Sequence, residues 1–592
     1  MKESRRKAGR GRVVIDRVEP TVPCGPGEGP FPVKRVTGES VHVSADILAD
    51  GHDIVRAVLR CRPAGKRGWR EEELEPGSND SWHGRFTVDA PGPWEFSIRG
   101  WIDHPRTWRS GLRKKHDAAI VSEVDLRIGA ALVAKASERA GGADGLRLKA
   151  LAEQLANEAL AQDRRVAAAL DRHAEELVDA YPDLSCATDL PTPLRVWVDR
   201  ERAAFSAWYE LFPRSCGAEG RHGTFRDVIE HLPEIARLGF DILYLPPVHP
   251  IGLTKRKGRN NSTEAGPDDP GSPWAIGSSQ GGHTAIHRDL GTEADFLELV
   301  DRAGSYEMEI ALDIAFQCSP DHPWVREHPA WFVHRPDGSI QYAENPPKKY
   351  EDIYPINFET EEWEALWEAL RGVFLHWIER GVRVFRVDNP HTKSFPFWDW
   401  AIGTIHETYP DAIFLAEAFT RPKRMYRLAK GGFTQSYTYF TWRNSPEELR
   451  QYMTELTRDH PREYFRPNFW PNTPDILHED LQTGGRAAFI ARLVLAATLS
   501  SNYGIYGPAF ELMEHEPVRP GSEEYLNSEK YEIRSWQRDD PESLAPIISR
   551  VNAIRRANRA LQSNRHLVFH TVDNPRLLCY SKSDDSGGNV IL

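Results

Sequence analysis

The sequence has little of several features that assign a protein class at once. Cysteine is scarce: six occur in 592 residues, at positions 24, 61, 186, 216, 318 and 579, and no CxxC pair is present. Wide spacing of this kind predicts reduced thiols rather than a disulfide framework or a zinc site. We therefore expect a cytoplasmic protein.

The chain also lacks the signals of a membrane or secreted protein. No stretch of about 18 uninterrupted apolar residues occurs, so we expect no membrane span. The basic segment 1–12 is not followed by an apolar region, so we expect no secretory signal. With 75 basic and 87 acidic side chains, the formal net charge is −12. Such a chain is a poor counterion for a phosphate backbone, so we expect no nucleic-acid partner.

What is present is an ordinary globular composition whose pattern changes along the chain. Short β-type runs broken by Gly and Pro predict an N-terminal β-sandwich. An Ala-, Leu- and Glu-rich stretch with helical spacing predicts a bundle of two to four helices. We expect a disordered tail (1–12), the β-sandwich (13–108), the helical bundle (109–190), a catalytic domain (191–552) with an insertion lobe at about 320–357, and a C-terminal β domain that begins at 553 and is truncated at 592.

The catalytic range alternates strands with helices. Strand-like runs occur at 207–212, 241–245, 309–314, 382–387, 412–416, 435–440, 466–470 and 503–506. Because helical stretches lie between most of them, the pattern fits a (β/α)₈ TIM barrel better than an open sheet. The expected fold class is therefore α/β.

Three carboxylates stand where such a barrel keeps its reactive groups, at the C-terminal ends of strands. Asp388 and Glu417 end the fourth and fifth expected strands, and Asp475 follows the seventh. Arg386, two residues before Asp388, points the same way and keeps that carboxylate ionised, as a nucleophile requires. Glu417 follows an apolar run with no adjacent cation, which favours the protonated form of an acid. Two carboxylates flanking one bond are the equipment of glycosyl transfer.

These residues resemble the motifs of the α-amylase superfamily, glycoside hydrolase family 13. The Arg-Val-Asp run at 386–388, Glu417 and Asp475 match its catalytic motifs, and Asp313 matches its first motif. The resemblance implies that Asp388 is the nucleophile, Glu417 the general acid/base and Asp475 the transition-state stabiliser.

Two positions depart from that pattern. Cys318 and Pro474 stand where most amylases carry His, which argues against an ordinary amylase. Within the superfamily, four segments closely resemble the bacterial α-1,4-glucan:maltose-1-phosphate maltosyltransferase family: 255–261, 317–324, 345–354 and 388–393. The likeness covers nearly the whole chain, which departs from that family in the length of the C-terminal domain.

This closer resemblance implies an activity and a set of contacts. The activity is transfer of maltosyl from α-maltose 1-phosphate to the non-reducing end of an α-1,4-glucan, with retention and release of phosphate, in glycogen or α-glucan synthesis. A homodimer built through the N-terminal region is also implied. The implied substrate contacts are Lys257, Gln317, Asp352, Asn389, Lys530 and Tyr531.

A cluster on the insertion after the third strand supports a phosphate leaving group independently. It comprises Asn345, Lys348, Lys349 and Tyr350. Lysine suits phosphate as a point charge, and Asn and Tyr add neutral donors. We group Arg386 with these substrate-binding residues. No Gly-rich phosphate loop and no metal-ligand spacing occurs, so we expect neither a metal nor an organic cofactor.

Two alternatives remain open. One is a hydrolase or a maltose–trehalose isomerase of the same superfamily, which rapid hydrolysis without phosphate dependence would favour. The other is a non-catalytic glucan-binding protein that keeps the barrel. The intact carboxylate trio argues against the second, because a binder has no use for a paired nucleophile and acid.

Overall fold

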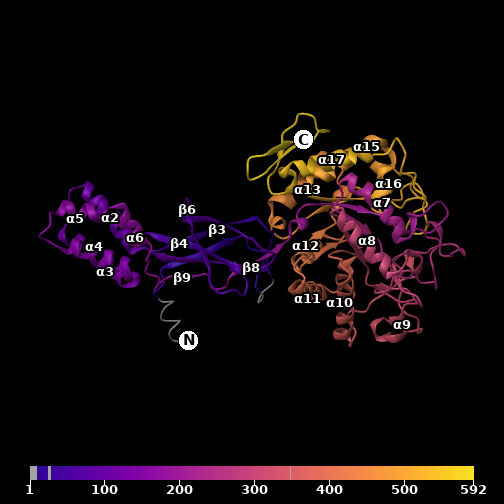
Figure 1. Cartoon of the computed structure of the whole chain (residues 1–592), viewed down its shortest axis with the longest axis horizontal. Helices are drawn as coiled ribbons and strands as arrows, with labels where there is room; N and C mark the ends of the chain where they lie inside the picture. Colours follow the sequence, from indigo (N-terminus) through magenta and orange to yellow (C-terminus); the bar gives the residue numbers. More distant parts are fainter. Residues whose placement is uncertain (1–9, 25–28, 347) are drawn as a thin grey trace. The chain divides into compact units, whose positions relative to one another are not determined.

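The structure, a computed structural model, describes residues 10–24, 29–346 and 348–592 (Figure 1). The chain divides into two compact units, the first ending at Val198 and the second beginning at Asp199. Most of the tail expected over 1–12 lies outside the described residues. No helix of the described part combines the length and the apolar character needed to span a bilayer.

Two sheets form the strand-rich part of the first unit. One sheet has the order β1 (Val13–Glu19), β3 (Ser40–Ala49), β7 (Ser81–Thr87), β6 (Glu75–Pro76). The other has the order β2 (Val33–Val36), β10 (Leu194–Asp199), β8 (Gly92–Ile102), β4 (Val55–Pro63), β5 (Arg70–Glu73), with β9 (Thr188–Asp189) on β8. Burial alternates along β3, as it does when one face of a strand packs on a core. β10 lies within the range expected for the catalytic domain, yet it pairs antiparallel with β8.

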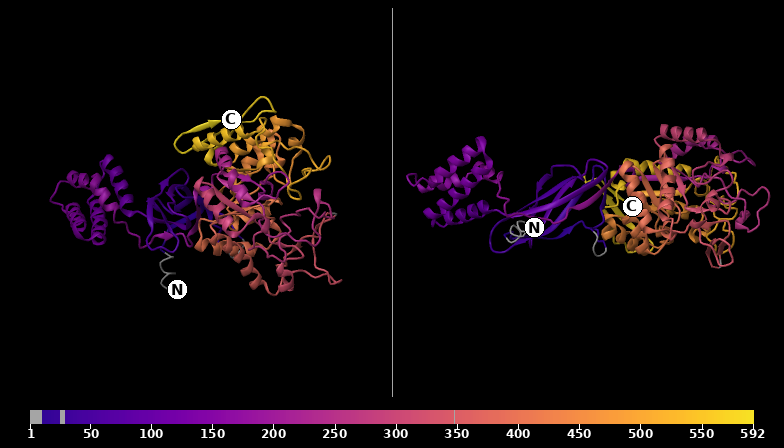
Figure 2. Two further views of the ribbon diagram at one scale, coloured as in Figure 1. Left: turned by 45° about the vertical axis from the view of Figure 1, so that its right-hand side comes forward. Right: turned by 90° about the horizontal axis from the view of Figure 1, so that it is seen from below.

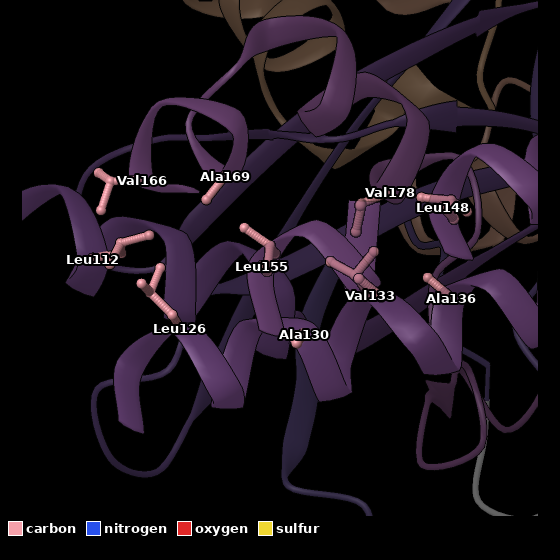
Figure 3. Close-up of a cluster of buried hydrophobic side chains, with 11 residues drawn as sticks. Leu112, Leu126, Ala130, Val133, Ala136, Leu148, Leu155, Val166, Ala169 and Val178 are labelled. Atoms are coloured by element: carbon pink, nitrogen blue, oxygen red, sulfur yellow. The ribbon is translucent and has the colours of Figure 1, made fainter. Parts of the chain in front are cut away.

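Helices separate β8 from β9 in the chain and gather at one end of the strands (Figures 1 and 2). They are α2 (His104–Asp117), α3 (Glu123–Ala140), α4 (Gly142–Ala156), α5 (Gln162–Ala169) and α6 (Arg172–Asp179). The sequence predicts two to four helices, whereas the described residues form five. Asp171 caps the start of α6 and so separates it from α5. Figure 3 shows the apolar side chains that these helices bury together, including Leu126, Leu148 and Leu155.

The second unit is built on eight parallel strands, which confirms the expected fold class. Their order is β20 (Gln435–Ser436), β19 (Ile413–Ala416), β18 (Val384–Val387), β13 (Glu309–Ile314), β12 (Ile242–Leu245), β11 (Ser206–Glu210), β22 (Asn502–Tyr506), β21 (Asn468–Phe469). A parallel bridge between Ser436 and Pro467 joins the two ends and closes the barrel. Nearly every strand residue is buried, as expected for a barrel covered on its outside and filled within.

Helices alternate with these strands and cover the barrel (Figure 2). The longer ones are α7 (Phe225–Leu238), α8 (Glu293–Ser305), α10 (Trp363–Glu379), α11 (Phe395–Thr408), α12 (Pro422–Lys430), α13 (Pro446–Arg458), α15 (Gly485–Leu499) and α17 (Ala545–Ala557); the shorter are α9 (Pro323–Glu327), α14 (Glu479–Thr483) and α16 (Gly507–Glu511). Reciprocal capping boxes set the N-termini of two of these helices: Thr224 with Asp227 on α7, and Thr292 with Asp295 on α8.

Two of the barrel strands differ from the sequence expectation. The sixth strand ends at Ser436 rather than at 440, because Thr438 caps a 3₁₀ turn over Tyr439–Trp442. The seventh is likewise only two residues long, Asn468–Phe469. Beyond α17, β23 (Leu567–His570), β24 (Cys579–Ser583) and β25 (Asn589–Ile591) form an antiparallel sheet.

The insertion after β13 carries short hairpin-like pairs. They are β14 (Gln317–Cys318) with β17 (Tyr354–Pro355) and β15 (Ala343–Asn345) with β16 (Lys348–Tyr350). The first pair begins three residues after the barrel strand, so the insertion starts at the same barrel end as the strand-end carboxylates.

Candidate active site

The sequence around Asp388 places a carboxylate at the rim of the barrel. β18 is buried along its whole length, and the Asp388 N–H continues the ladder by donating to the Ile314 carbonyl at 3.0 Å. Because side chains alternate along a strand, Arg386 and Asp388 share one face. The expected contact between them is present: Arg386 Nη1 lies 2.9 Å from Asp388 Oδ1.

One guanidinium holds three carboxylates together. Arg386 Nη1 also lies 2.9 Å from Asp313 Oδ2, and its Nη2 lies 2.6 Å from Glu417 Oε1. All four side chains are buried. The expectation that no cation stands beside Glu417 is therefore wrong. β18 and β19 are neighbouring parallel strands in register, so the side chain of Arg386 reaches the end of the next strand.

The two carboxylates on this arginine titrate in opposite directions. Burial alone raises the pKa of Asp388, but the charges of Arg386 and Lys393 and a hydrogen bond with Glu417 bring that pKa below its ordinary value. Burial raises the pKa of Glu417 well above its ordinary range; Arg386 opposes this, while Asp388 and Asp475 add to it. The pKa of Asp388 is thus lowered and that of Glu417 raised, so Asp388 is the first of the pair to ionise.

The turn after Asp388 contributes to the same arrangement. Asn389 adopts a left-handed conformation, with φ of 41°, which asparagine tolerates better than most residues. Its backbone N–H lies 3.3 Å from Glu417 Oε2 and donates to it. The side chain of Asn389 is exposed, so only its backbone contacts the carboxylates.

Asp475 joins the site through Lys530 and a tryptophan. Lys530 Nζ donates to Asp475 Oδ1 at 2.6 Å and lies 5.1 Å from the centre of the Trp274 ring. Burial lowers the pKa of Lys530, but the charge and hydrogen bond of Asp475, together with Tyr531 and Asp388, raise it. Trp274 Nε1 donates to Asp313 Oδ2 at 3.1 Å, and its carbonyl accepts from Gln317 Nε2 at 3.2 Å. Trp274 thus connects Gln317 and Lys530 to the carboxylates on Arg386.

Lys257, Asp352 and Tyr531 lie on the side of Lys530. Asp352 is buried, and burial raises its pKa against the opposing charges of Lys257 and Lys530. Its Oδ1 has no hydrogen-bond partner among the described residues. Tyr531 lines one cavity with Asp475 and Lys530. These polar groups surround the space beside Asp475.

The remaining predicted contacts do not join this cluster in the described residues. The side chains of Asn345 and Lys348 lie outside the described part of the structure. Tyr350, on β16, makes no hydrogen bond from its side chain to the described carboxylates. Lys349 contributes its backbone carbonyl, which accepts from Lys257 Nζ at 3.4 Å.

Three residues of the site were missed from the sequence. Glu210 ends β11 and is buried; burial raises its pKa strongly, and its Oε2 has no partner among the described residues. In the sequence, Glu210 stands inside the expected strand 207–212, so the rule applied to Asp388 does not identify it; only the structure ends β11 at this residue. Tyr244 donates to Asp313 Oδ2 at 2.6 Å. Like Trp274, it resembles an ordinary core aromatic in the sequence, so no local signal marks it.

One cluster of possible metal ligands lies close by. His283, Cys318 and His322 are buried, with ligand atoms within 4.8 Å of one another. Their nitrogens already have partners: His322 Nδ1 accepts from the Trp324 N–H at 3.0 Å, and its Nε2 lies 3.1 Å from His283 Nδ1. His283 Nε2 in turn lies 2.9 Å from the Ala315 carbonyl. A metal ion on the two facing nitrogens would break this chain, so we assign it to hydrogen bonding.

Fold and site together define the class of protein. A closed parallel barrel that brings two carboxylates with opposite pKa shifts onto one arginine has the groups that α-amylase-type glycosyl transfer requires. Among solved structures, an α-amylase from Lactobacillus plantarum matches with a TM-score of 0.52 and 21% identity over 65% of this chain and 87% of that chain. At this identity the match shows a shared fold.

Sequence comparison identifies the family. The family model described as α-1,4-glucan:maltose-1-phosphate maltosyltransferase, domain N/S, matches residues 11–200. The α-1,4-glucan:maltose-1-phosphate maltosyltransferase of Chlorobaculum tepidum is 55% identical over 99% of this chain and 87% of its own length. That of Methylacidiphilum infernorum is 50% identical over the same shares. The chain belongs to the α-1,4-glucan:maltose-1-phosphate maltosyltransferase family of glycosyl-transferring enzymes.

Proposed function

We propose that the chain transfers a maltosyl unit from α-maltose 1-phosphate to the non-reducing end of an α-1,4-glucan, through a covalent intermediate on Asp388. The observation that carries this proposal is the shared contact of Asp388 and Glu417 with Arg386. It supports a nucleophile and an acid in adjacent positions with opposite protonation states. The names of the relatives supply the substrate class.

The first half-reaction forms the intermediate. An Asp388 carboxylate oxygen attacks the anomeric carbon of the maltosyl unit while the bond from that carbon to the phosphate oxygen breaks. The proton of Glu417 passes to the leaving phosphate oxygen. The products are a maltosyl ester on Asp388, ionised Glu417 and free phosphate.

The second half-reaction consumes the intermediate. The 4-hydroxyl of the terminal glucose of the acceptor loses its proton to Glu417 and attacks the same anomeric carbon. The ester bond to Asp388 breaks, and both side chains return to their starting states. Two displacements on opposite faces of the sugar give net retention.

The polar cluster beside Asp475 is the proposed donor site. Asp475 is assigned to stabilise the transition state, and the cations Lys257 and Lys530 suit the phosphate and hydroxyl groups of the donor. Asp352 Oδ1, an acceptor with no partner in the described part, suits a sugar hydroxyl. The other proposed contacts are Gln317, Asn389, Tyr531, Asn345, Lys348 and Tyr350.

Assembly and location complete the proposal. Ile120, Val124 and Ile128 are 66%, 61% and 48% exposed, and the last two lie one turn apart on α3. This apolar row lies outside the bundle's own core and supports a homodimer built through the first unit. We place the reaction in cytoplasmic glycogen or α-glucan synthesis, where six widely spaced cysteines suit a reducing environment.

Phosphate release tests the proposal. The protein is incubated with α-maltose 1-phosphate and maltohexaose, and we expect phosphate together with products longer by two glucose units per step. Asp388→Ala is expected to lose turnover while it still binds glucan. Rapid hydrolysis of maltohexaose without phosphate dependence would instead support a hydrolase.

A further inference from the structure

Two turns that are far apart in the sequence carry the two lysines of the proposed donor site. The first turn directly follows the buried Lys257 and is closed by a hydrogen bond from the Gly258 N–H to the Ser262 carbonyl at 2.9 Å. A Cβ at Gly258 would collide with the carbonyl oxygen of Glu264, so this turn accepts no larger residue there. Lys257 is thus attached to a tight turn of defined shape.

The second turn carries Lys530 and lies in the connection between α16 and α17. The Tyr531 N–H donates to the Ser528 carbonyl at 2.9 Å, and the Lys530 N–H donates to Ser528 Oγ at 3.2 Å. Because these bonds fix the backbone of Lys530 and Tyr531 together, a shift of the turn would move both side chains in the cavity that they line with Asp475.

An asparagine in the first turn joins it to an asparagine at the start of the second. Asn260 Oδ1 accepts from the Asn527 backbone N–H at 2.7 Å, and Asn260 Nδ2 donates to Asn527 Oδ1 at 3.2 Å. We call these two hydrogen bonds the asparagine clasp. Asn260 also lines the cavity of Asp475, Lys530 and Tyr531. The side chain of Asn260 takes part in both bonds, so the clasp depends chiefly on this residue.

The backbone conformation explains why asparagine suits both positions. The φ angles of Asn260 and Asn527 are 50° and 53°, in the left-handed region that most side chains avoid. Glycine adopts this region freely but has no side chain that could form the clasp. Asparagine tolerates the region and carries a donor and an acceptor on one short side chain. Asparagine therefore meets the requirements of the turn and of the clasp together.

The lysines that the two turns carry repel each other. Lys257 and Lys530 both act on the buried carboxylate of Asp352, which places two cations near one acid. Like charges favour a wider separation of the turns. Another contact between the turns is weak, because Arg259 Nε lies 3.5 Å from Glu532 Oε1 and the Arg259 side chain is 76% exposed. The asparagine clasp therefore opposes the repulsion between the lysines.

We propose that Asn260 and Asn527 are positioning residues, whose clasp holds Lys257 and Lys530 at the separation that binding of α-maltose 1-phosphate requires. The inference rests on the proposed function, because it takes this phosphorylated disaccharide as the ligand. The clasp bonds involve neither the acceptor nor the reacting carboxylates. Loss of the clasp should therefore weaken donor binding and leave the transfer step itself unchanged.

Donor binding tests the clasp without turnover. Calorimetric titration with α-maltose 1-phosphate gives a Kd in the Asp388→Ala background. Asn260→Gly removes both clasp bonds and Asn527→Gly removes one, while glycine keeps the left-handed conformation. Asn79→Gly is the matched control, an exposed asparagine with φ of 54° in a turn of the first unit. We expect the Kd to rise about tenfold in Asn260→Gly, about threefold in Asn527→Gly and not in Asn79→Gly.

The double variant distinguishes a clasp from two unrelated effects. Because Asn260→Gly already removes both bonds, addition of Asn527→Gly should weaken donor binding no further. Independent effects would instead multiply to a rise in Kd of about thirtyfold, and this result would overturn the proposal. An unchanged donor Kd in Asn260→Gly would overturn it as well.

Steady-state kinetics of the chain with Asp388 intact give a second readout. The KM for α-maltose 1-phosphate should rise by the same factors, while kcat and the KM for maltohexaose stay within about twofold of the wild type. A lower kcat with an unchanged donor KM would indicate a merely structural role and overturn the proposal. Should the wild type neither bind nor use α-maltose 1-phosphate, the proposed function fails and this inference fails with it. Should the wild type do both while Asn260→Gly behaves identically, only this inference fails.

Discussion

Removing the charge of Arg386 tests the electrostatic basis of the site. Arg386 contacts Asp313, Asp388 and Glu417 at 2.9, 2.9 and 2.6 Å, all buried. In Arg386→Met nothing of equal strength opposes burial, so the pKa of Asp388 moves from below its ordinary value to above it. Loss of one partner of a buried pair costs about 3–5 kcal/mol. We expect kcat/KM for phosphate release to fall by about 10³-fold or more, because the proposed nucleophile, Asp388, becomes protonated.

The pH dependence of stability carries a definite sign. In the wild type, Asp388 has a lowered pKa, so its stabilising contribution is present above its unfolded pKa and is lost as the pH falls through the folded pKa. In Arg386→Met the buried acids bind protons more tightly in the folded state than in the unfolded state. Stability then falls as the pH rises. The deficit in Tm relative to the wild type should therefore grow between pH 5 and pH 8.

Two further variants complete the experiment. Arg386→Lys keeps the charge, but one ammonium group cannot reproduce the forked contacts, so we expect an intermediate loss of about 10–10²-fold. Arg326→Met, which removes an exposed arginine 3.7 Å from Glu327, serves as the control and should change Tm little. Thermal unfolding and phosphate release are measured across the pH range. The reasoning would be refuted if the difference in Tm between Arg386→Met and the wild type did not change with pH, or if it grew as the pH fell.

Three other variants address the acid, the stabiliser and the assembly. In the proposed mechanism Glu417 acts as an acid only while protonated, so wild-type kcat should fall as the pH rises through its raised pKa. Glu417→Gln should lower kcat by about 10²–10⁴-fold, and its kcat should no longer fall at alkaline pH. Stopped phosphate assays measure both effects. Lys530→Met should lower kcat/KM by about 10–10²-fold through loss of the contact with Asp475, with partial recovery in Lys530→Arg. Val124→Asp places a charge on the exposed row of α3, and sedimentation velocity should show a monomer where the wild type is a dimer.

The parts of the site that the sequence predicts are those with a local signal. An apolar run that ends on an acid marks Asp388 and Glu417, and the alternation of a strand puts Arg386 beside Asp388. The contact between Arg386 and Glu417 has no such signal, because it depends on the register of two strands whose paired residues, such as Arg386 and Leu415, are 29 apart in the chain. For the same reason the sequence suggested that Glu417 had no cation beside it.

Trp274 shows a second limit of the sequence. It lies in the long connection between β12 and α8, where no periodic pattern predicts the direction of a side chain. Only the folded connection brings its indole N–H to Asp313 and its ring beneath Lys530. The predicted end of the sixth strand was wrong for a related reason. The aromatic and Thr residues at 437–440 suit a strand locally, but the Thr438 hydroxyl accepts from the Phe440 N–H and caps a turn.

The opposite pKa shifts of Asp388 and Glu417 cannot come from Arg386 alone, since both contact it at hydrogen-bond distance. The difference lies in what else surrounds each carboxylate. Asp388 also faces Lys393 and receives a hydrogen bond from Glu417, whereas Glu417 faces the negative charges of Asp388, Asp475 and Asp313. Two acids beside one cation share a proton, and the acid with more negative neighbours keeps it. In the proposed mechanism, esterification of Asp388 removes its charge. This removes a cause of the raised pKa of Glu417 and favours the ionised form of Glu417 at the step that requires a base.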